Sequence, residues 1–480
     1  MLEQLKPQSV WKYFEQFCAI PHPSGHEQQA QKFVIDSAAK LGLTATTDAT
    51  GNVLIRKKST GNQIDRKTVA LQSHLDMVPQ KNEATVHDFR KDPIRPRIDG
   101  EWVKATGTTL GADNGIGVAV ALAVLESRSI NHGPLEALFT LDEERGMTGA
   151  FGLAKDFLSG GTLINLDTEN EHEICIGCAG GTDVVAELPV STLPVPVSGK
   201  AFSVSIKGLR GGHSGMEIHL NRANALKCMA MVLSAALKEI DLHLATLSGG
   251  SARNAIPREA FAEVTIPANK ADAFIGIVTK VRNEISGTLT PTDREFSLVV
   301  SEISPPQKII TDDSLQRLLT ILTECPYGVQ KMSATVPDMV ETSNNLSAVV
   351  TRPESIRIDC MLRSSSDSQL SNLRDRIDGI FKKQGATTTF GSTYPGWQPD
   401  PESSLLAVMK KAHHQVYGKN PEIVAVHAGL ECGIIGSRFP GMEMISCGPT
   451  IEYAHSPDER MNIASVERFW NWLVTALEQL

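Results

Sequence analysis

Short apolar runs in the first third of the chain constrain its fold more than any other feature. Several of them are followed directly by titratable side chains. The runs are Val53–Ile55, Val69–Leu71, Leu135–Leu141 and Thr162–Leu166. Three of them are followed closely by His74, Glu144 and Asp167, and an apolar helical stretch at 115–126 lies between them. Strands that alternate with helices predict α/β layering. Open α/β sheets bind ligands beyond the carboxyl ends of their strands, so a functional site is expected there.

The sequence changes character after about residue 183. A proline-rich connector, LPVSTLPVPVSG, precedes the alternating apolar and polar residues of Phe202–Ile206, which predict a half-exposed strand. Further strands are expected near 260–264, 296–300 and 356–361, and helices near 221–238, 270–283, 314–324 and 368–383. This middle block therefore has the pattern of a separate α+β domain.

A second connector, rich in proline and glycine, begins at Tyr394 and precedes another α/β stretch that ends in a helix at 465–480. The whole chain of 480 residues is too long for one compact core. We therefore predict one domain in two parts, 1–183 and 393–480, with the α+β domain 184–392 inserted between them.

Composition excludes several classes of partner. The chain has 46 Lys and Arg against 55 Asp and Glu, a formal charge of −9, which argues against binding to nucleic acid or to an anionic membrane. Its longest apolar run, roughly Ile116–Leu125, is shorter than the ~20 residues that span a bilayer. The first residues lack a basic segment followed by an apolar one, so we expect a cytoplasmic protein. Cys175 and Cys178 form a lone CxxC pair, which favours two buried thiols over a zinc or redox site.

His74 and Asp76 are two residues apart, a spacing that places both side chains on one side of an extended chain. An imidazole and a carboxylate so placed suit a metal ligand and its supporting group, although such a pair is also common without function. Asp113 lies in GADNGIG, just before the 115–126 helix. This segment lacks the third glycine of a dinucleotide fingerprint, so a dehydrogenase is disfavoured. Taken alone, Asp113 favours a helix cap over a ligand.

Acidic residues follow two of the apolar runs. The segment 142–144 is one group, for which a solvated loop is the alternative, and Asp167 is the other. A second imidazole, His455, lies late in the chain in EYAHSPDE. The candidates combine two nitrogens with three carboxylates: His74, Asp113, Glu144, Asp167 and His455. This mixed set suits divalent ions such as zinc, and five ligands suit two ions that share a carboxylate.

Eight segments, spread in order over nearly the whole chain, carry a family resemblance. They are IPHPSGHE (20–27), SHLDMV (73–78), TLGADNGIG (109–117), LDEERGMTGA (141–150), NLDTE (165–169), GGHSG (211–215), RNAIPRE (253–259) and EYAHSPDE (452–459). They resemble the M20 family of zinc peptidases, and most closely its aminoacyl-histidine dipeptidase branch. The resemblance implies an α/β zinc-exopeptidase-like catalytic domain, with a central mixed sheet flanked by helices, and an inserted α+β lid domain. It also implies a metal-dependent dipeptidase that cleaves Xaa-His and other unblocked dipeptides.

The resemblance assigns the metal ligands by position. It implies two zinc ions per chain, with cobalt or manganese as alternatives. One ion is held by His74 and Asp167, the other by Glu144 and His455, and Asp113 bridges them.

It also assigns roles to two further carboxylates. Glu143 is implied to be the general base, and Asp76 the carboxylate that orients His74. In this family the bridging aspartate precedes a cis peptide bond, so we predict that the Asp113–Asn114 bond is cis.

Four residues in the later segments are implied to hold the substrate: His213, Asn254, Arg363 and Gly429. His213 would contact the developing oxyanion, and the others the carboxyl end of the substrate, which suits the guanidinium of Arg363. The alternatives are a loop-packing histidine and a surface arginine. The inserted domain is large enough to supply these groups within one chain. A homodimer is compatible with the sequence, but a shared active site is not expected.

Two rival functions stay open. A deacylase or carboxypeptidase of the same family would cleave N-acyl amino acids or longer peptides. A metal-binding scaffold with a decayed site would catalyse nothing, and the complete ligand set together with Glu143 argues against it. The preference for histidine and the identity of the metal rest on the resemblance alone.

Overall fold

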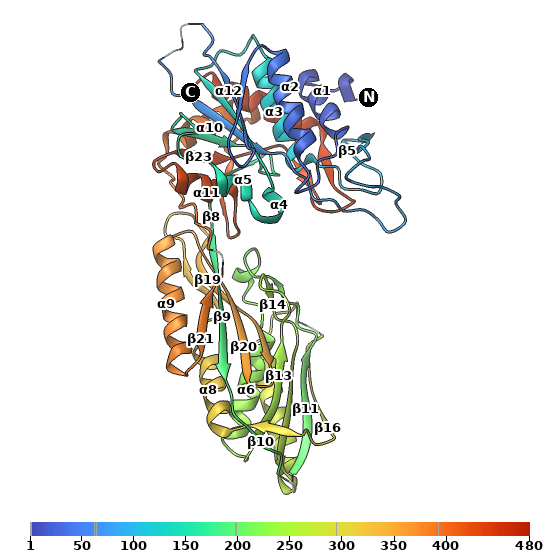
Figure 1. The fold of residues 1–480 in the computed structure, drawn as a ribbon, viewed down its shortest axis with the longest axis vertical. Coiled ribbons are helices and arrows are strands. Elements are labelled where there is room, and N and C mark those ends of the chain that lie inside the picture. The colour runs from blue at the N-terminus through green and yellow to red at the C-terminus, as the bar shows by residue number, and fades with distance from the viewer. Residues whose placement is uncertain (1, 62, 64, 197–198, 294, 392) are drawn as a thin grey trace. The chain divides into compact units, whose positions relative to one another are not determined.

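The computed structural model describes residues 2–61, 63, 65–196, 199–293, 295–391 and 393–480, which fold into two compact units (Figure 1). The units are, first, Met1–Gly177, Trp397–Ala425 and Leu430–Leu480, and, second, Cys178–Gly396 and Val426–Gly429. The boundary predicted at 183/184 falls inside strand β9 (Gly180–Pro189), and the short segment Val426–Gly429 lies in the second unit although the sequence pattern places it in the first domain. The limits of independently folding domains stay a prediction.

The first unit contains an eight-stranded mixed sheet, counted over the described residues. Its strands are β1 (Thr44–Thr47), β2 (Val53–Lys57), β3 (Val69–His74), β6 (Leu135–Thr140), β7 (Thr162–Asn165), β8 (Glu173–Cys178), β22 (Glu422–Val426) and β23 (Glu443–Ser446), in the order β1-β2-β6-β3-β7-β23-β8-β22. β3 pairs in parallel with β6 and β7, whereas β2 and β6 are antiparallel. All four apolar runs predicted as strands are strands, and the mixed sheet agrees with the fold that the resemblance implies.

Helices flank this sheet: α1 (Gln8–Cys18), α2 (Gln28–Lys40), α3 (Ala112–Glu126), α4 (Glu143–Gly146), α5 (Thr148–Gly152), α10 (Ser404–Tyr417), α11 (Glu431–Arg438) and α12 (Ile463–Leu477). β3 and β6 are buried along their whole length, so both of their faces are covered, as their unbroken apolar sequences suggest. In α3, regular helix begins at Gly115, because Asp113 and Asn114 have non-helical dihedral angles. The Asp113–Asn114 peptide bond is cis, which confirms that prediction.

A small four-stranded sheet in the same unit carries the second predicted imidazole. It consists of β4 (Arg97–Asp99), β5 (Trp102–Lys104), β24 (Ile451–Glu452) and β25 (Arg460–Asn462). β24 and β25 are antiparallel, with Glu452 opposite Arg460. The loop between them, 453–459, contains His455 and is therefore fixed at both ends by sheet pairing.

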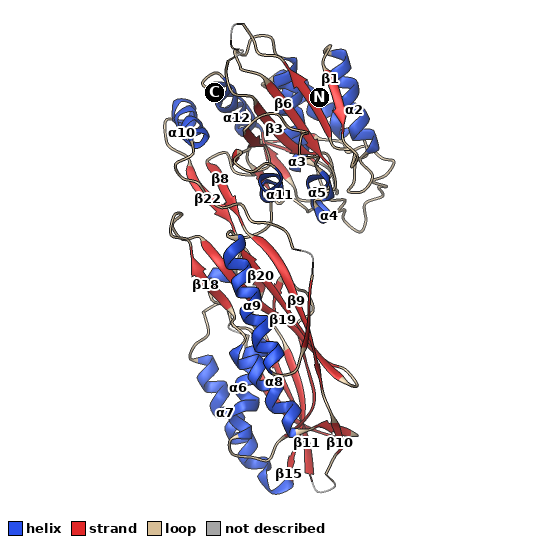
Figure 2. Cartoon of the chain, turned by 60° about the vertical axis from the view of Figure 1, so that its left-hand side comes forward, coloured by secondary structure: helices blue, strands red, loops and turns tan. Residues whose placement is uncertain are grey.

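The second unit is built on a nine-stranded sheet, again counted over the described chain. Its strands are β9, β11 (Gly199–Lys207), β13 (His243–Gly249), β15 (Ala260–Pro267), β16 (Ser297–Ile303), β18 (Gly328–Met332), β19 (Val340–Thr351), β20 (Ser355–Ser364) and β21 (Thr387–Phe390). Helices α6 (Ala225–Leu237), α7 (Ala271–Ser286), α8 (Asp312–Glu324) and α9 (Asp367–Lys383) pack on one face of it (Figure 2). The predicted strands and helices are confirmed here, whereas β9, β13, β18, β19 and β21 were not predicted. In β19, the polar run TSNN breaks any apolar alternation.

All eight cysteines are buried, which agrees with the thiol interpretation of Cys175 and Cys178. Among the helices of the described chain, none combines the length and apolarity needed to cross a bilayer.

Candidate active site

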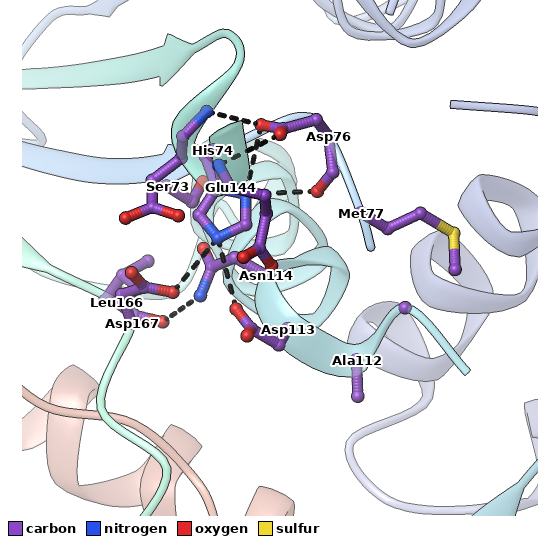
Figure 3. A network of polar contacts seen from close by, with 12 residues as sticks. Ser73, His74, Asp76, Met77, Ala112, Asp113, Asn114, Glu144, Leu166 and Asp167 are labelled. Atoms are coloured by element: carbon purple, nitrogen blue, oxygen red, sulfur yellow. Dashed lines mark hydrogen bonds and ion pairs between the residues drawn. The ribbon is translucent and has the colours of Figure 1, made fainter. Parts of the chain in front are cut away.

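His74 is the last residue of β3 and stands at the carboxyl edge of the main sheet, as predicted. Its side chain is buried, and its Nε2 lies 3.1 Å from Asp113 Oδ1 and 3.4 Å from Asp167 Oδ1 (Figure 3). Asp113 reaches this point from the start of α3, and Asp167 from the segment just after β7. Three separate elements of the fold therefore bring an imidazole and two carboxylates together.

Asp113 also faces the second imidazole. His455 Nε2 lies 3.1 Å from Asp113 Oδ2 and 3.0 Å from Glu144 Oε2. Because its two oxygens face different histidines, Asp113 lies between a His74–Asp167 group and a Glu144–His455 group. The structure thus brings all five predicted ligands into one cluster.

Asp76 supports this cluster in two ways. Its carboxylate lies 3.4 Å from His74 Nδ1, while its backbone carbonyl, at 3.0 Å, accepts the shorter contact. The same carboxylate accepts the backbone N–H groups of Glu143 at 2.9 Å and Glu144 at 3.2 Å. Asp76 therefore touches both the imidazole and the turn that carries the two glutamates.

Charge is unevenly balanced in the cluster. Burial raises the pKa of Asp167 to about 7 and raises the pKa of Glu143 well above its ordinary value. Burial lowers the pKa of His74, but Asp167 and Asp113 outweigh it and raise that pKa well above 6.5. Hydrogen bonds to Asp113 and Glu144 raise the pKa of His455 to about 11. Neutral imidazoles therefore supply too little positive charge to balance the carboxylates of the cluster.

The donor set fits divalent metal ions. Among the described residues, possible ligand atoms within 4.8 Å of one another occur in three groups: His74, Glu143 and Glu144; His74, Asp113 and Asp167; and Asp113, Glu144 and His455. Two buried oxygens of the cluster lack a well-formed hydrogen bond from the described residues: Glu144 Oε1, and Asp167 Oδ1, which has only the 3.4 Å contact with His74 Nε2. Buried acceptors without donors are costly, and a cation would satisfy them.

The second unit holds the four residues predicted to bind substrate. His213 lies in the short strand β12 (Gly212–His213), opposite Ala255 of β14 (Ala255–Ile256), and the carbonyl of Asn254 accepts the N–H of Ser214 at 2.7 Å. The N–H groups of Gly215 and Met216 donate to His213 Nδ1 at 3.1 and 3.0 Å. With Nδ1 acting as an acceptor, the proton of the neutral ring is on Nε2, which is left as a donor.

Arg363 lies within β20 rather than after a strand, and only 5% of it is exposed. Its Nη1 donates to the hydroxyl of Tyr394 at 2.9 Å, its Nε has no acceptor, and it forms no ion pair with any carboxylate in the described chain. A side chain at Gly215 would collide with the carbonyl oxygen of His427 and come within 3.1 Å of Arg363 Nε. His213, Arg363 and the segment Val426–Gly429, which contains Gly429, therefore surround one glycine. A surface position for Arg363 is excluded.

Glu431 and Glu459 are two of the buried carboxylates of the first unit for which no role was predicted. Glu431, at the start of α11, accepts hydrogen bonds from Gln72 Nε2 and Thr140 Oγ1, both at 2.7 Å, and burial raises its pKa to about 7. Glu459 accepts four backbone N–H groups next to Asp113. The only local signal for Glu459 was its place four residues after His455 in the same segment.

A mixed α/β sheet with such a cluster at its carboxyl edge defines a class, the hydrolytic enzymes that work with paired divalent ions. The sequence matches the model of Peptidase family M20/M25/M40 over residues 70–479. The chain belongs to this family and is a peptide hydrolase.

Individual relatives match over the full length. The cytosol non-specific dipeptidase of Escherichia coli K12 is 43% identical over 479 residues, covering 100% of this chain and 99% of the relative. The crystal structure of the aminoacylhistidine dipeptidase of Vibrio alginolyticus superposes with a TM-score of 0.96 at 42% identity, over 100% of this chain and 98% of the other. The aminopeptidase PepT of Bacillus cereus, with a TM-score of 0.59 and 16% identity over 99% of both chains, shares the fold.

Proposed function

We propose that this protein is a cytosolic metallo-dipeptidase that hydrolyses unblocked dipeptides, Xaa-His dipeptides such as β-alanyl-histidine among them. One observation carries the proposal: the Asp113 carboxylate lies between two imidazoles, at 3.1 Å from each, with further carboxylates on both sides. The names of the Escherichia coli and Vibrio alginolyticus relatives support the dipeptidase activity, and the first also supports the compartment.

Two divalent ions, zinc in our proposal and cobalt or manganese as alternatives, would be held by the five ligands of the cluster. His74 and Asp167 would hold one ion, Glu144 and His455 the other, and Asp113 both. When bound, such ions lower the pKa of a water molecule toward ~7 and polarise the scissile carbonyl.

Glu143 would be the general base. Its carboxylate would take a proton from the attacking water and deliver it to the nitrogen of the leaving amine. Its position suits this role, because it shares a group with His74 and Glu144 while its backbone is held by Asp76. Asp76 would keep both the imidazole and the base in place.

The second unit would supply the substrate contacts. The Nε2–H of His213 would donate to the oxyanion that forms on the scissile carbonyl. Arg363 would bind the substrate carboxylate, together with Asn254 and Gly429. The buried guanidinium supports this role, because a buried cation without a carboxylate partner favours an anionic ligand.

A substrate panel tests the proposal. β-Alanyl-histidine, other dipeptides, a tripeptide and an N-acetyl amino acid would be assayed with enzyme whose metal content is measured, alongside a Glu143→Gln preparation as the control for contaminating peptidases. We expect hydrolysis of the dipeptides only, and two metal ions per chain. Faster cleavage of the N-acetyl amino acid would instead indicate a deacylase, and faster cleavage of the tripeptide a longer-peptide exopeptidase. A homodimer stays a prediction, to be checked by light scattering.

A further inference from the structure

Glu459 accepts hydrogen bonds from the backbone segment that carries Asp113. Its side chain is buried, and its two oxygens accept four consecutive N–H groups. Oε2 accepts those of Leu110 at 2.6 Å and Gly111 at 3.0 Å, and Oε1 accepts those of Ala112 at 2.7 Å and Asp113 at 3.3 Å. These donors lie in the segment 110–113, which leads into the regular part of α3 and has no helical hydrogen bonds of its own to satisfy them.

The backbone around Glu459 is also held in place by contacts of its own. Glu459 closes the loop 453–459, and the next residue, Arg460, pairs with Glu452 in the β24–β25 ladder. The guanidinium of Arg460 also lies 4.2 Å from the centre of the Trp102 ring. The backbone of Glu459 is therefore fixed by its neighbour Arg460. The same loop also places His455 beside Asp113.

We propose that Glu459 is a positioning residue for the metal site. It sets the distance between the segment 110–113, which carries Asp113, and the loop 453–459, which carries His455. The inference rests on the proposed function, since it concerns how the proposed bridging ligand is held. Asp113 must direct one oxygen to each imidazole, so a shift of its backbone would disturb both proposed metal positions together. No other described side chain accepts the N–H groups of Leu110 through Asp113.

The simpler alternative is that Glu459 only caps α3. A cap stabilises the folded chain but leaves the metal affinity of the folded protein unchanged. A positioning residue also sets that affinity, as groups behind metal ligands do in other proteins. The two roles therefore differ in a measurable quantity other than activity.

The experiment compares Glu459→Gln with Asp458→Asn. Both remove one negative charge from neighbouring positions, but Asp458 is exposed and its side chain accepts no hydrogen bond from the described residues. In Glu459→Gln, the amide N–H groups of the glutamine would face the backbone N–H groups of the segment 110–113, and two donors cannot bond to each other. The control variant leaves the hydrogen bonds of this segment unchanged. Zinc affinity is measured by competition with a chromophoric chelator, at a temperature where circular dichroism shows each protein folded.

We expect two zinc ions on the wild type and on Asp458→Asn, and about 10- to 100-fold weaker binding of both ions by Glu459→Gln. Equal zinc affinity of Glu459→Gln and wild type would overturn the proposal and leave Glu459 as a cap. If Glu459→Gln does not fold, Glu459→Asp replaces it, keeping the charge on a shorter side chain; it should bind zinc more weakly than wild type, and unchanged affinity would again refute the proposal. A wild type that binds none of zinc, cobalt and manganese would instead refute the proposed function.

Discussion

The carboxylate of Asp76 accepts the backbone N–H of Glu143 at 2.9 Å. The two residues come from different strand ends, since Asp76 follows β3 and Glu143 follows β6. Asp76 also lies beside His74 Nδ1, so one buried carboxylate links the imidazole to the turn that carries the proposed base. This link makes Asp76 more than a partner of His74.

Asp76→Asn should therefore impair catalysis even where metal is retained. The amide offers one acceptor oxygen in place of two, so an N–H of Glu143 or Glu144 loses its partner. We expect kcat to fall about 10-fold or more, equivalent to at least ~1.4 kcal/mol of transition-state stabilisation. Kinetics at saturating zinc would show this, with the exposed Asp156→Asn as the matched control. Unchanged kcat would mean that the turn is held without Asp76.

Glu143→Gln should keep both metal ions and lose most of the turnover. Glutamine has the same shape but cannot accept a proton at neutral pH, and general bases contribute about 10²- to 10⁴-fold to rates. Metal content by elemental analysis and kcat on one dipeptide would be measured on the same preparation. Turnover close to the wild type would remove Glu143 from the mechanism.

Arg363→Lys should raise KM for dipeptides with a free carboxyl group. Lysine keeps the charge but loses the planar pair of donors and the contact with Tyr394. We expect KM to rise about 10-fold or more, with a smaller change in kcat, and the difference to vanish for a substrate whose carboxyl group is amidated. Arg357→Lys, on the same strand and paired with Asp359, is the control. An equal rise for the amidated substrate would argue against a carboxylate contact.

His427 should make the folded protein sensitive to mild acid. Its side chain is buried and its Nε2 lies 2.7 Å from Ser343 Oγ; burial, and then Arg363, lower its pKa from 6.5 to about 3. Between these two pH values the unfolded chain binds a proton that the folded protein excludes. The free energy of unfolding therefore falls as the pH falls below about 6.5, by up to ~1.4 kcal/mol per pH unit, until about pH 3.

Denaturant unfolding at pH 7.0, 6.0 and 5.0 would check this for wild type and His427→Gln. The variant cannot take up the proton, so its stability should decline less steeply with acid than that of the wild type. Parallel declines would show that other groups cause the pH dependence.

Removing the metal ions should destabilise the protein. Asp113, Glu144 and Asp167 lie close together, and without cations only the two imidazoles offset their charge. Ions that bind the folded state alone stabilise it by an amount that grows with the logarithm of their free concentration. A chelator should therefore lower the unfolding temperature, and added zinc should restore it. Asp113→Asn should show a smaller zinc-dependent shift than Glu143→Gln, and an unfolding temperature independent of zinc would contradict a metal site.

Much of the fold was predictable because its signals are local. Buried strands such as Val69–His74 and Leu135–Thr140 read as apolar runs, and α3 follows directly from its apolar stretch. β19 could not be read in this way, because a polar strand gains its burial only from the strands and helices around it. The short segment Val426–Gly429 likewise joins the second unit through contacts that its own sequence does not reveal.

From the sequence alone the candidate side chains of the site could be named, since three of the proposed ligands follow predicted strands and all five lie in segments that resemble one family. The contacts that hold these side chains in place become visible only in the folded chain. Glu459 lies 346 residues from Asp113 along the chain, and its proposed role depends on backbone N–H groups that every residue except proline possesses. Likewise, the folded structure is needed to see that Arg363 is buried and forms no ion pair with a carboxylate of the described residues. Residue type is written in the sequence, but burial and the choice of hydrogen-bond partner arise only when distant segments pack together.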